Sequence, residues 1–217
     1  MATETALAKG QSRVLSKPSS PRSNDGRDNA NDDLIIRTGE ELGERVGSSA
    51  NATTTAHHHK GHHPRDDEDM SDESTTYTVL DSLGSGTFGQ VVAAASSADG
   101  QTRALKVIKN HPAYFHQAHV EIGILRTLNT KCGDRPSGSV IVDLMDYFVC
   151  HNHLCLVFEL LGMNLYELLR KNKFKGLHLG AIRGMMKQLL GALDLLRDAH
   201  VVHCDIKPEN ILLCRDN

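Results

Sequence analysis

The spacing of apolar residues divides the chain into two parts of different character. Residues 1–75 are rich in Ser, Asn, Asp, Gly and Thr and hold few aliphatic clusters beyond Leu34-Ile35-Ile36. Such a segment buries too little apolar surface to offset the ordering of its backbone, which costs roughly 1–2 kcal/mol per residue. The pattern therefore predicts a disordered tail over residues 1–75.

From Tyr77 onward, short β-rich segments come first and long helical segments follow. Runs rich in β-branched residues predict strands, and apolar residues at three- and four-residue steps predict helices. The last helical segment has a wide apolar face, formed by Leu179, Ile182, Met186, Leu189, Leu193 and Leu196. The expected strands are residues 77–83, 90–96, 102–109, 140–149 and 154–160, and the expected helices are residues 113–128, 164–172 and 179–200. This order predicts a mixed α+β domain after the tail.

Composition and charge narrow the class of protein only modestly. The 217 residues have a formal net charge of −3, from 24 Lys and Arg against 27 Asp and Glu, so no basic field favours nucleic acid. No run approaches the roughly 18 apolar residues of a membrane span, and the N-terminus lacks the apolar stretch of a signal peptide. Five cysteines without a C-x-x-C pair favour a reducing compartment. We therefore expect a soluble protein of the cytoplasm or nucleus that binds neither nucleic acid nor membrane.

A glycine-rich motif, G-S-G-T-F-G-Q-V, follows the first expected strand. In dinucleotide-binding folds such glycines open a helix, whereas here a second strand and an Asp-Gly hairpin signal follow, as in protein kinases. Glycines let backbone amides approach phosphate oxygens, and Phe88 at the tip would shield the site from water. Taken alone, the motif also fits an ordinary glycine-rich hairpin. The nucleotide-binding candidates in it are Gly84, Ser85, Gly86, Thr87, Phe88, Gly89 and Val91.

A lysine and a glutamate lie on faces that are otherwise apolar. Alternation along the third expected strand puts Lys106 on the same face as Ala104, whereas Lys109 lies on the opposite face and is expected in solvent. On the next helix, Glu121 falls within an apolar stripe. A buried carboxylate without a partner costs several kcal/mol. We therefore expect Lys106 and Glu121 to meet, which leaves the ammonium to hold the α- and β-phosphates of a nucleotide.

A second motif, H-C-D-I-K-P-E-N, begins at His203. In the catalytic loop of a kinase, Asp205 would accept the proton of a substrate hydroxyl, and Lys207 would stabilise charge on the transferring phosphoryl group. Asn210 would bind a magnesium ion. His203 is expected to brace the loop rather than to titrate in catalysis. The spacing of the four residues is unusual enough that, together with the glycine motif and Lys106, it predicts a kinase.

From Tyr77 to its end the chain resembles eukaryotic protein kinases of the dual-specificity tyrosine-regulated (DYRK) group, and most of all the Yak-type members. The resemblance is carried by GSGTFGQV, KNHPAYFHQAHVEIGILRTLN, DYFVCHNHLCLVFELLGMNLYELL and LLRDAHVVHCDIKPENILLC. Cys204 is particularly informative, because most protein kinases carry arginine at this position. The resemblance implies an α+β protein-kinase-like fold, with a five-stranded antiparallel small lobe over residues 77–160 and the first helices of the large lobe over residues 161–217.

The same resemblance implies an activity and the residues of its nucleotide site. The activity would be ATP- and Mg²⁺-dependent phosphorylation of Ser or Thr in protein substrates, with tyrosine autophosphorylation during maturation. Phe158 would lie behind the adenine pocket, and the backbones of Glu159 and Leu161 would bond the adenine edge. Apolar contacts to the base are implied for Leu83, Val91, Ala104 and Leu212, and Asn164 would lie near the ribose.

A kinase of this group would continue past Asn217 with an Asp-Phe-Gly triplet, an activation loop and further helices. We therefore expect the 217-residue chain by itself to have little transferase activity, because it lacks the aspartate that holds magnesium against the phosphates. We also expect part of the apolar face on its last helix to be bare. The resemblance gives no oligomeric state, and we expect a monomer.

Two alternatives remain open from the sequence. The first is a catalytically inactive, nucleotide-binding pseudokinase or scaffold that regulates a partner through its small lobe. The second is a metal-binding interaction protein, suggested by the tract HHHKGHH at residues 57–63. Histidine tracts followed by an acidic block, as here, are more often simply solvated.

Overall fold

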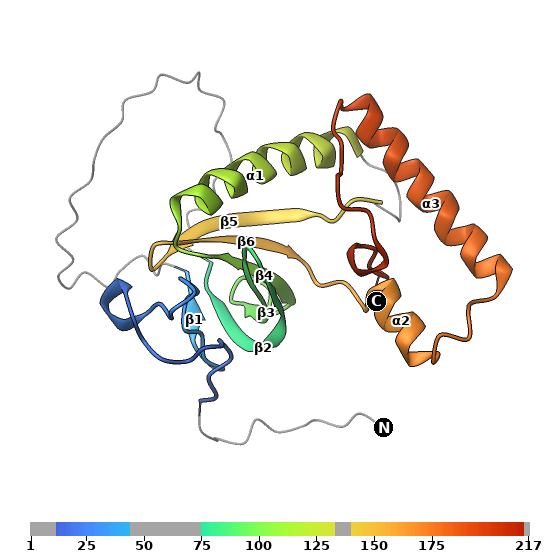
Figure 1. The fold of residues 1–217 in the computed structure, drawn as a ribbon. Coiled ribbons are helices and arrows are strands. Elements are labelled where there is room, and N and C mark those ends of the chain that lie inside the picture. Colours follow the sequence, from blue (N-terminus) through green and yellow to red (C-terminus); the bar gives the residue numbers. More distant parts are fainter. Residues whose placement is uncertain (1–11, 44–74, 133–139, 215–217) are drawn as a thin grey trace, which may run out of the picture.

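The computed structural model describes residues 12–43, 75–132 and 140–214, which are coloured in Figure 1. Within these residues, the strands are β1 (Glu41–Leu42), β2 (Tyr77–Gly86), β3 (Gly89–Ser96), β4 (Thr102–Ile108), β5 (Leu144–Cys150) and β6 (His153–Glu159). The helices are α1 (Pro112–Cys132), α2 (Leu165–Lys171) and α3 (Leu179–Asp198). Short 3₁₀ turns cover Asn24–Gly26 and Pro208–Asn210.

The strands form one antiparallel sheet in the order β1-β2-β3-β4-β6-β5. Strands β2 to β6 are the five expected of the small lobe, and the α+β class is confirmed. The boundaries differ slightly: β2 continues to Gly86 and β5 begins only at Leu144. Helix α1 begins at Pro112 because proline suits the first turn of a helix, and it continues to Cys132.

One face of the sheet packs against residues 12–43. Leu34, Ile36 and Leu42 are at most 1% exposed, and they share a core cluster with sheet residues that include Leu105 and Val107. Burying each such side chain contributes about 1.5–3 kcal/mol toward the ordering of the segment. The prediction of disorder is therefore wrong for residues 12–43. The rest of the predicted tail, including the histidine tract, lies outside the described residues.

Backbone hydrogen bonds fix this N-terminal segment (residues 12–43) to the edge of the sheet. The amide of Gly39 donates to the carbonyl of Val79, and the amide of Val79 donates to the carbonyl of Glu40, both at 2.8 Å. Figure 1 shows the segment, which includes β1, beside β2 and away from α2 and α3. Strand β1 is thus a sixth strand that the pattern of apolar residues did not predict.

A buried ion pair connects the same segment to β6. Nε2 of His153 lies 2.8 Å from Oδ1 of Asp28, and Nδ1 lies 2.7 Å from the carbonyl oxygen of Ile108. Both ring nitrogens of His153 therefore have an oxygen partner. Asn24 and Asn110 also donate to the carboxylate, each at 2.9 Å. Burial raises the pKa of Asp28, but these hydrogen bonds and the charge of His153 outweigh burial and lower the pKa below its usual value.

The opposite face of the sheet packs against α1, which lies along β5 in Figure 1. Ile108, Ala118, Ile122, Leu154 and Leu156 form a second core cluster, each at most 5% exposed. The expected helix face with its three- and four-residue spacing is thus the face that contacts the sheet. This packing sets the position of α1 relative to β4, on which the candidate site depends.

The two later helices are packed less completely. A capping box starts α2: Asn164 Oδ1 accepts from the amide of Glu167 at 2.8 Å, and the Glu167 side chain accepts from the amide of Asn164 at 3.3 Å. On α3, Leu179 and Leu190 are 74% and 65% exposed, which confirms the expectation of a partly bare apolar face. Among the described residues, no helix is both long and apolar enough to cross a membrane.

Candidate active site

The glycine motif forms the tight connection between β2 and β3, as expected. Gly89 has a φ of +155°, and a Cβ built there would lie only 2.1 Å from the carbonyl oxygen of Val107. Only glycine therefore allows β3 to approach β4 this closely. A Cβ at Gly84 or Gly86 would meet no described atom within 4 Å. Space beside these two glycines leaves the backbone of the loop accessible to a ligand.

The predicted pair at the centre of the site is confirmed. Nζ of Lys106 lies 2.7 Å from both carboxylate oxygens of Glu121. The sheet register puts Lys106 opposite Val91 of β3 and Leu156 of β6, and the packing of α1 brings Glu121 over the same face. The two side chains are 24% and 36% exposed, so a ligand can reach them. A helix and a strand from distant parts of the sequence thus meet at one ion pair.

A small cavity of about 90 Å³ lies against this pair. It is lined by Phe88, Lys106, Ile108, Tyr114, Gln117, Ala118 and Glu121. The residues come from the glycine loop, β4 and α1. The loop tip therefore lies over the Lys106–Glu121 pair, as a phosphate-covering loop would.

Lys109 does not extend into solvent as expected. Its side chain is 17% exposed, and Nζ lies 4.0 Å from Oδ1 of Asp33, whose side chain is 12% exposed. The sequence-based expectation failed because it left that face of β4 open, whereas the N-terminal segment covers it. Lys106 and Lys109 therefore have different carboxylate partners on different faces.

The residues assigned to the adenine side lie on β3, β4, β6 and the connection that follows β6. Val91 and Ala104 lie on neighbouring strands, and Ala104 pairs with Phe158. Glu159 ends β6, and its carboxylate accepts from the amide of Asp143 at 3.1 Å. Leu161 lies in the connection between β6 and α2.

Three further residues of this group lie on β2, at the start of α2 and after the catalytic loop. Leu83 on β2 and Leu212 after the catalytic loop are 49% and 45% exposed. Leu212 forms an isolated β-bridge with Asn164. Asn164 has a structural task as the cap of α2, in addition to the ribose contact expected for it.

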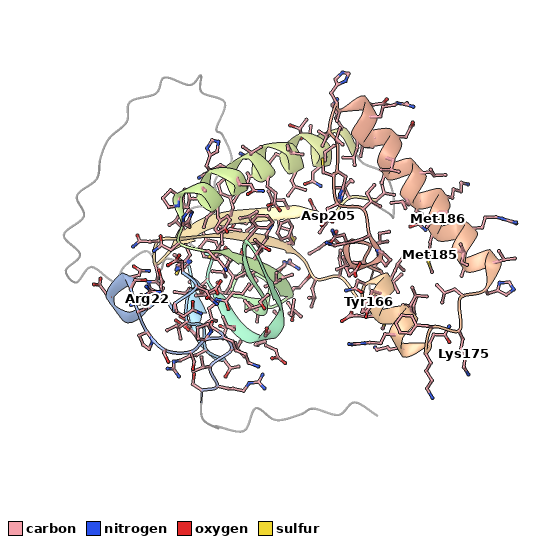
Figure 2. The ribbon with its side chains drawn as sticks, viewed as in Figure 1. Arg22, Tyr166, Lys175, Met185, Met186 and Asp205 are labelled. Atoms are coloured by element: carbon pink, nitrogen blue, oxygen red, sulfur yellow. The ribbon has the colours of Figure 1, made fainter. Side chains whose placement is uncertain are left out.

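The catalytic-loop residues lie on the segment that runs from the end of α3 back to α2, where Figure 2 labels Asp205. Nζ of Lys207 is 2.8 Å from Oδ2 of Asp205, and Nδ2 of Asn210 donates to the same oxygen at 2.9 Å. These hydrogen bonds, first from Lys207 and then from Asn210, lower the pKa of Asp205. The Asp205 carboxylate in turn raises the pKa of Lys207. The structure thus brings the three predicted catalytic residues together, with Asp205 held as a carboxylate.

His203 braces this loop, as expected. Its Nδ1 accepts a hydrogen bond from the amide of Asp205 at 3.2 Å. Cys204 between them has a positive φ of 64°, a conformation that few residues other than glycine adopt. The turn at Cys204 therefore directs Asp205 relative to its two neighbours.

One polar cluster next to the glycine loop was not predicted from the sequence. The side chain of Gln90, directly after the last glycine of the motif, is 6% exposed. Its amide nitrogen donates to the carbonyl of Leu34, and its amide oxygen accepts from Oγ of Ser16 at 2.9 Å. The N-terminal segment is thus bonded to the base of the loop. The available signal was the short apolar run Leu34-Ile35-Ile36, which is consistent with a segment that packs against a core.

Comparison with known proteins agrees with this geometry. The family model for the protein kinase domain matches residues 77–217. The chain is 42% identical over 201 residues to the serine/threonine-protein kinase ppk15 of Schizosaccharomyces pombe, which covers 93% of this chain and 32% of that protein. It is 44% identical over 202 residues to a dual specificity protein kinase YAK1 homolog of Arabidopsis thaliana, a match that covers 93% of this chain and 18% of that protein. It is also 40% identical over 207 residues to the dual specificity protein kinase YAK1 of Saccharomyces cerevisiae, a match that covers 95% of this chain and 22% of that protein.

The extent of these matches is informative. The chain spans less than a third of the length of each of these relatives. A match of 201 residues in a chain of 217 must include residues 17–201, so it extends over most of the ordered N-terminal segment. The match to the DYRK-family kinase pom1 of Schizosaccharomyces pombe, 45% identical, is shorter and covers 138 residues.

Given the family match, the Lys106–Glu121 pair and the catalytic-loop cluster, the chain belongs to the protein kinase family, with relatives in the Yak and DYRK groups.

Proposed function

We propose that this chain forms the nucleotide-binding and proton-accepting part of an ATP-dependent protein kinase. The reaction is transfer of the γ-phosphate to Ser or Thr of protein substrates, with tyrosine autophosphorylation during maturation. The observation that carries the proposal is the Lys106–Glu121 contact, in which both carboxylate oxygens lie 2.7 Å from the ammonium. A lysine held in this way beneath a glycine loop provides a fixed positive charge for phosphate oxygens.

The apolar side of the proposed site suits a purine base. Leu83 and Leu212 are large apolar side chains that are nearly half exposed, and Val91 and Ala104 on neighbouring strands are partly buried. Covering such side chains with a flat heterocycle removes apolar surface from water, which favours binding. In the proposed complex the backbones of Glu159 and Leu161 bond the adenine edge, with Phe158 behind the pocket and Asn164 near the ribose.

The catalytic loop supplies groups for the transfer itself. Asp205 would accept the proton from the substrate hydroxyl, because it is held as a carboxylate by Lys207 and Asn210. Lys207 would stabilise negative charge on the phosphoryl group.

Asn210 is the residue of this loop suited to hold Mg²⁺. Its Nδ2 is bonded to the carbonyl and carboxylate oxygens of Asp205, both at 2.9 Å, so its Oδ1 is the atom available for a hard cation that prefers oxygen. In the described part of the chain, no group of three or more His, Cys, Asp or Glu residues has the arrangement of a complete metal site. Nucleotide phosphates would supply further oxygen ligands. A bound Mg²⁺ neutralises charge that develops on the phosphates during transfer.

Nucleotide binding by the chain tests the first half of the proposal. Titration of the purified chain with a fluorescent ATP analogue and Mg²⁺ is expected to show saturable binding. Lys106→Met should weaken it about tenfold or more, since hydrogen bonds to charged groups contribute about 1.5–3 kcal/mol. The matched control is Lys187→Met on the exposed surface of α3, which should bind as the wild type does. Equal affinity of all three proteins would contradict the assignment of Lys106.

A phosphate-transfer assay tests the second half of the proposal, the catalytic role of Asp205. It is carried out on the protein isolated from the cells that produce it naturally. The tagged protein, purified from that source, should transfer radiolabelled phosphate to a general protein substrate, and Asp205→Asn should abolish transfer while leaving nucleotide affinity within about twofold. Binding without transfer in the unmodified protein would instead support the pseudokinase alternative. Binding by neither protein would exclude both.

A further inference from the structure

Two aromatic rings join the tip of the glycine loop to the start of α1. Phe88 lies in the turn between β2 and β3, and Tyr114 lies in the first turn of α1. Their ring centroids are 5.6 Å apart, and their planes meet at 83°. This edge-to-face arrangement is one that aromatic pairs prefer, and it contributes about 0.5–1.5 kcal/mol beyond area burial.

The two rings are supported to different degrees. Tyr114 packs against the core cluster between α1 and the sheet, which includes Ile108 and Ala118. It is also in ring contact with His111, at 5.2 Å. Phe88 is 42% exposed and belongs to a two-residue turn. Tyr114 is therefore the anchored partner, and Phe88 is the partner whose position depends on the contact.

A backbone hydrogen bond acts at the same place. The carbonyl oxygen of Phe88 accepts from the amide of Lys109 at 3.0 Å, which holds the turn against the end of β4. This bond fixes the base of the turn but leaves the Phe88 side chain free to rotate about its own bonds. The ring contact with Tyr114 supplies the missing constraint.

The position in which the ring is held bears on the nucleotide site. Phe88 and Tyr114 line the same 90 Å³ cavity as Lys106 and Glu121. The aromatic contact therefore keeps the loop tip over the ion pair before any ligand is present. A loop that is already in place loses less conformational entropy when a ligand binds beneath it.

We propose that Tyr114 is a positioning residue for the glycine loop: its ring holds Phe88 over the Lys106–Glu121 pair and so raises nucleotide affinity. The inference rests on the proposed nucleotide site and concerns a residue that lines its cavity but is not among the expected nucleotide contacts. Tyr114 is not expected to contact the nucleotide, and its hydroxyl is not required. The aromatic ring alone is expected to suffice.

Three variants separate the ring contact from other effects. Tyr114→Leu removes the contact and should weaken binding of the fluorescent ATP analogue about three- to tenfold, the fold-change that corresponds to an aromatic pair. Tyr114→Phe keeps the ring and should bind within about twofold of the wild type. The matched control is Tyr166→Leu on α2, labelled in Figure 2, which breaks a similar edge-to-face pair with Phe174 at 6.0 Å. That control should leave nucleotide affinity unchanged.

A double-mutant cycle shows whether the two rings act through each other. Phe88→Leu breaks the same contact from the loop side without altering the core beneath α1. If the contact carries the effect, the variant with both substitutions should bind no more weakly than the weaker of the two single variants. Additive losses would mean that the rings act separately and would overturn the proposal.

Hydrogen exchange without nucleotide tests the positioning directly. Amides of residues 84–90 should exchange severalfold faster in Tyr114→Leu than in the wild type, with Tyr166→Leu unchanged. Unchanged exchange in Tyr114→Leu, or nucleotide affinity equal to that of the wild type, would overturn the inference. If the wild type binds no nucleotide, the proposed function fails for this chain, whereas the exchange result still decides whether Tyr114 holds the loop. Far-UV circular dichroism confirms that each variant is folded.

Discussion

The region that carries the Lys106–Glu121 pair and the region that carries the catalytic loop are held in place in different ways. Around the sheet, two core clusters cover opposite faces, and residues such as Ile36 and Leu105 are fully buried. In the described residues from 161 to 214, the buried apolar side chains are those of Leu165, Ala192 and Leu196. The sheet region has a continuous core, and the helical region after it does not.

The difference shows that the two parts of the proposed site depend on different interactions. The position of Glu121 relative to Lys106 follows from the packing of a whole helix on a sheet. By contrast, Asp205 is positioned by hydrogen bonds with neighbours in the same short loop, Lys207 and Asn210. Substitutions in the core should therefore affect the first pair strongly, and substitutions on the surface of α3 should affect neither.

The largest effect is expected from the buried ion pair between the N-terminal segment and β6. Asp28→Ala leaves His153 buried without its carboxylate, and breaking such a pair costs about 3–5 kcal/mol. Because the chain has no tryptophan, urea unfolding followed by far-UV circular dichroism is the suitable measurement.

An exposed ion pair between the N-terminal segment and β2 provides the control. Asp81 and Arg13 are 2.7 Å apart, with side chains 64% and 65% exposed. Asp81→Ala should cost no more than about 1 kcal/mol, because exposed pairs are solvated and screened. If Asp28→Ala reduced the free energy of unfolding as little as Asp81→Ala does, the N-terminal segment would not be part of the cooperative core.

A matched pair of isoleucines compares the two regions directly. Ile36 is fully buried, so Ile36→Ala should reduce the free energy of unfolding by about 3 kcal/mol. Ile182 on α3 is 38% exposed, and Ile182→Ala should change the free energy of unfolding by less than about 0.5 kcal/mol. The same urea titration measures both. A larger loss for Ile182→Ala would indicate that α3 is packed more tightly than the structure shows.

A smaller effect is expected at the start of α2. Asn164→Ala removes the capping box and should reduce the stability of α2 by about 1 kcal/mol. Asn164→Ser retains a cap and should reduce it by about a few tenths of a kcal/mol. Hydrogen exchange of the amides of residues 165–171 reports this local loss. Faster exchange in the serine variant than in the alanine variant would contradict the capping role.

The smallest effect is expected in the response to acid. The pKa of Asp28 is lowered in the folded protein, so its carboxylate stabilises the fold above the unfolded-state value of about 3.9. That contribution is lost as the pH falls through the lower folded-state pKa. In Asp28→Asn, the free energy of unfolding should therefore fall less steeply between pH 5 and pH 3 than in the wild type. Equal slopes would show that this carboxyl does not contribute to the acid response.

Much of the candidate site could be predicted because its residues recur at fixed local spacings. The glycine motif, Lys106 within its strand and the loop from His203 to Asn210 each follow from a few adjacent positions, and the structure brings them into the expected local arrangements. The meeting of Lys106 and Glu121 was predicted from burial, since each needs an opposite charge on an apolar face. The role proposed for Tyr114 could not be found in this way, because its partner Phe88 lies 26 positions earlier in the chain.

The amino-acid sequence by itself determined the order of strands and helices, the family, and the residues offered for nucleotide and catalysis. Only the tertiary structure decided that residues 12–43 are ordered, that Lys109 faces Asp33, and that Gln90 is bonded to the N-terminal segment. The physical reason is that propensity and periodicity act over a few residues, whereas the burial of Leu34 and Ile36 depends on a sheet face formed by strands far along the chain. A segment whose composition is typical of disorder becomes ordered when such a face is available to cover.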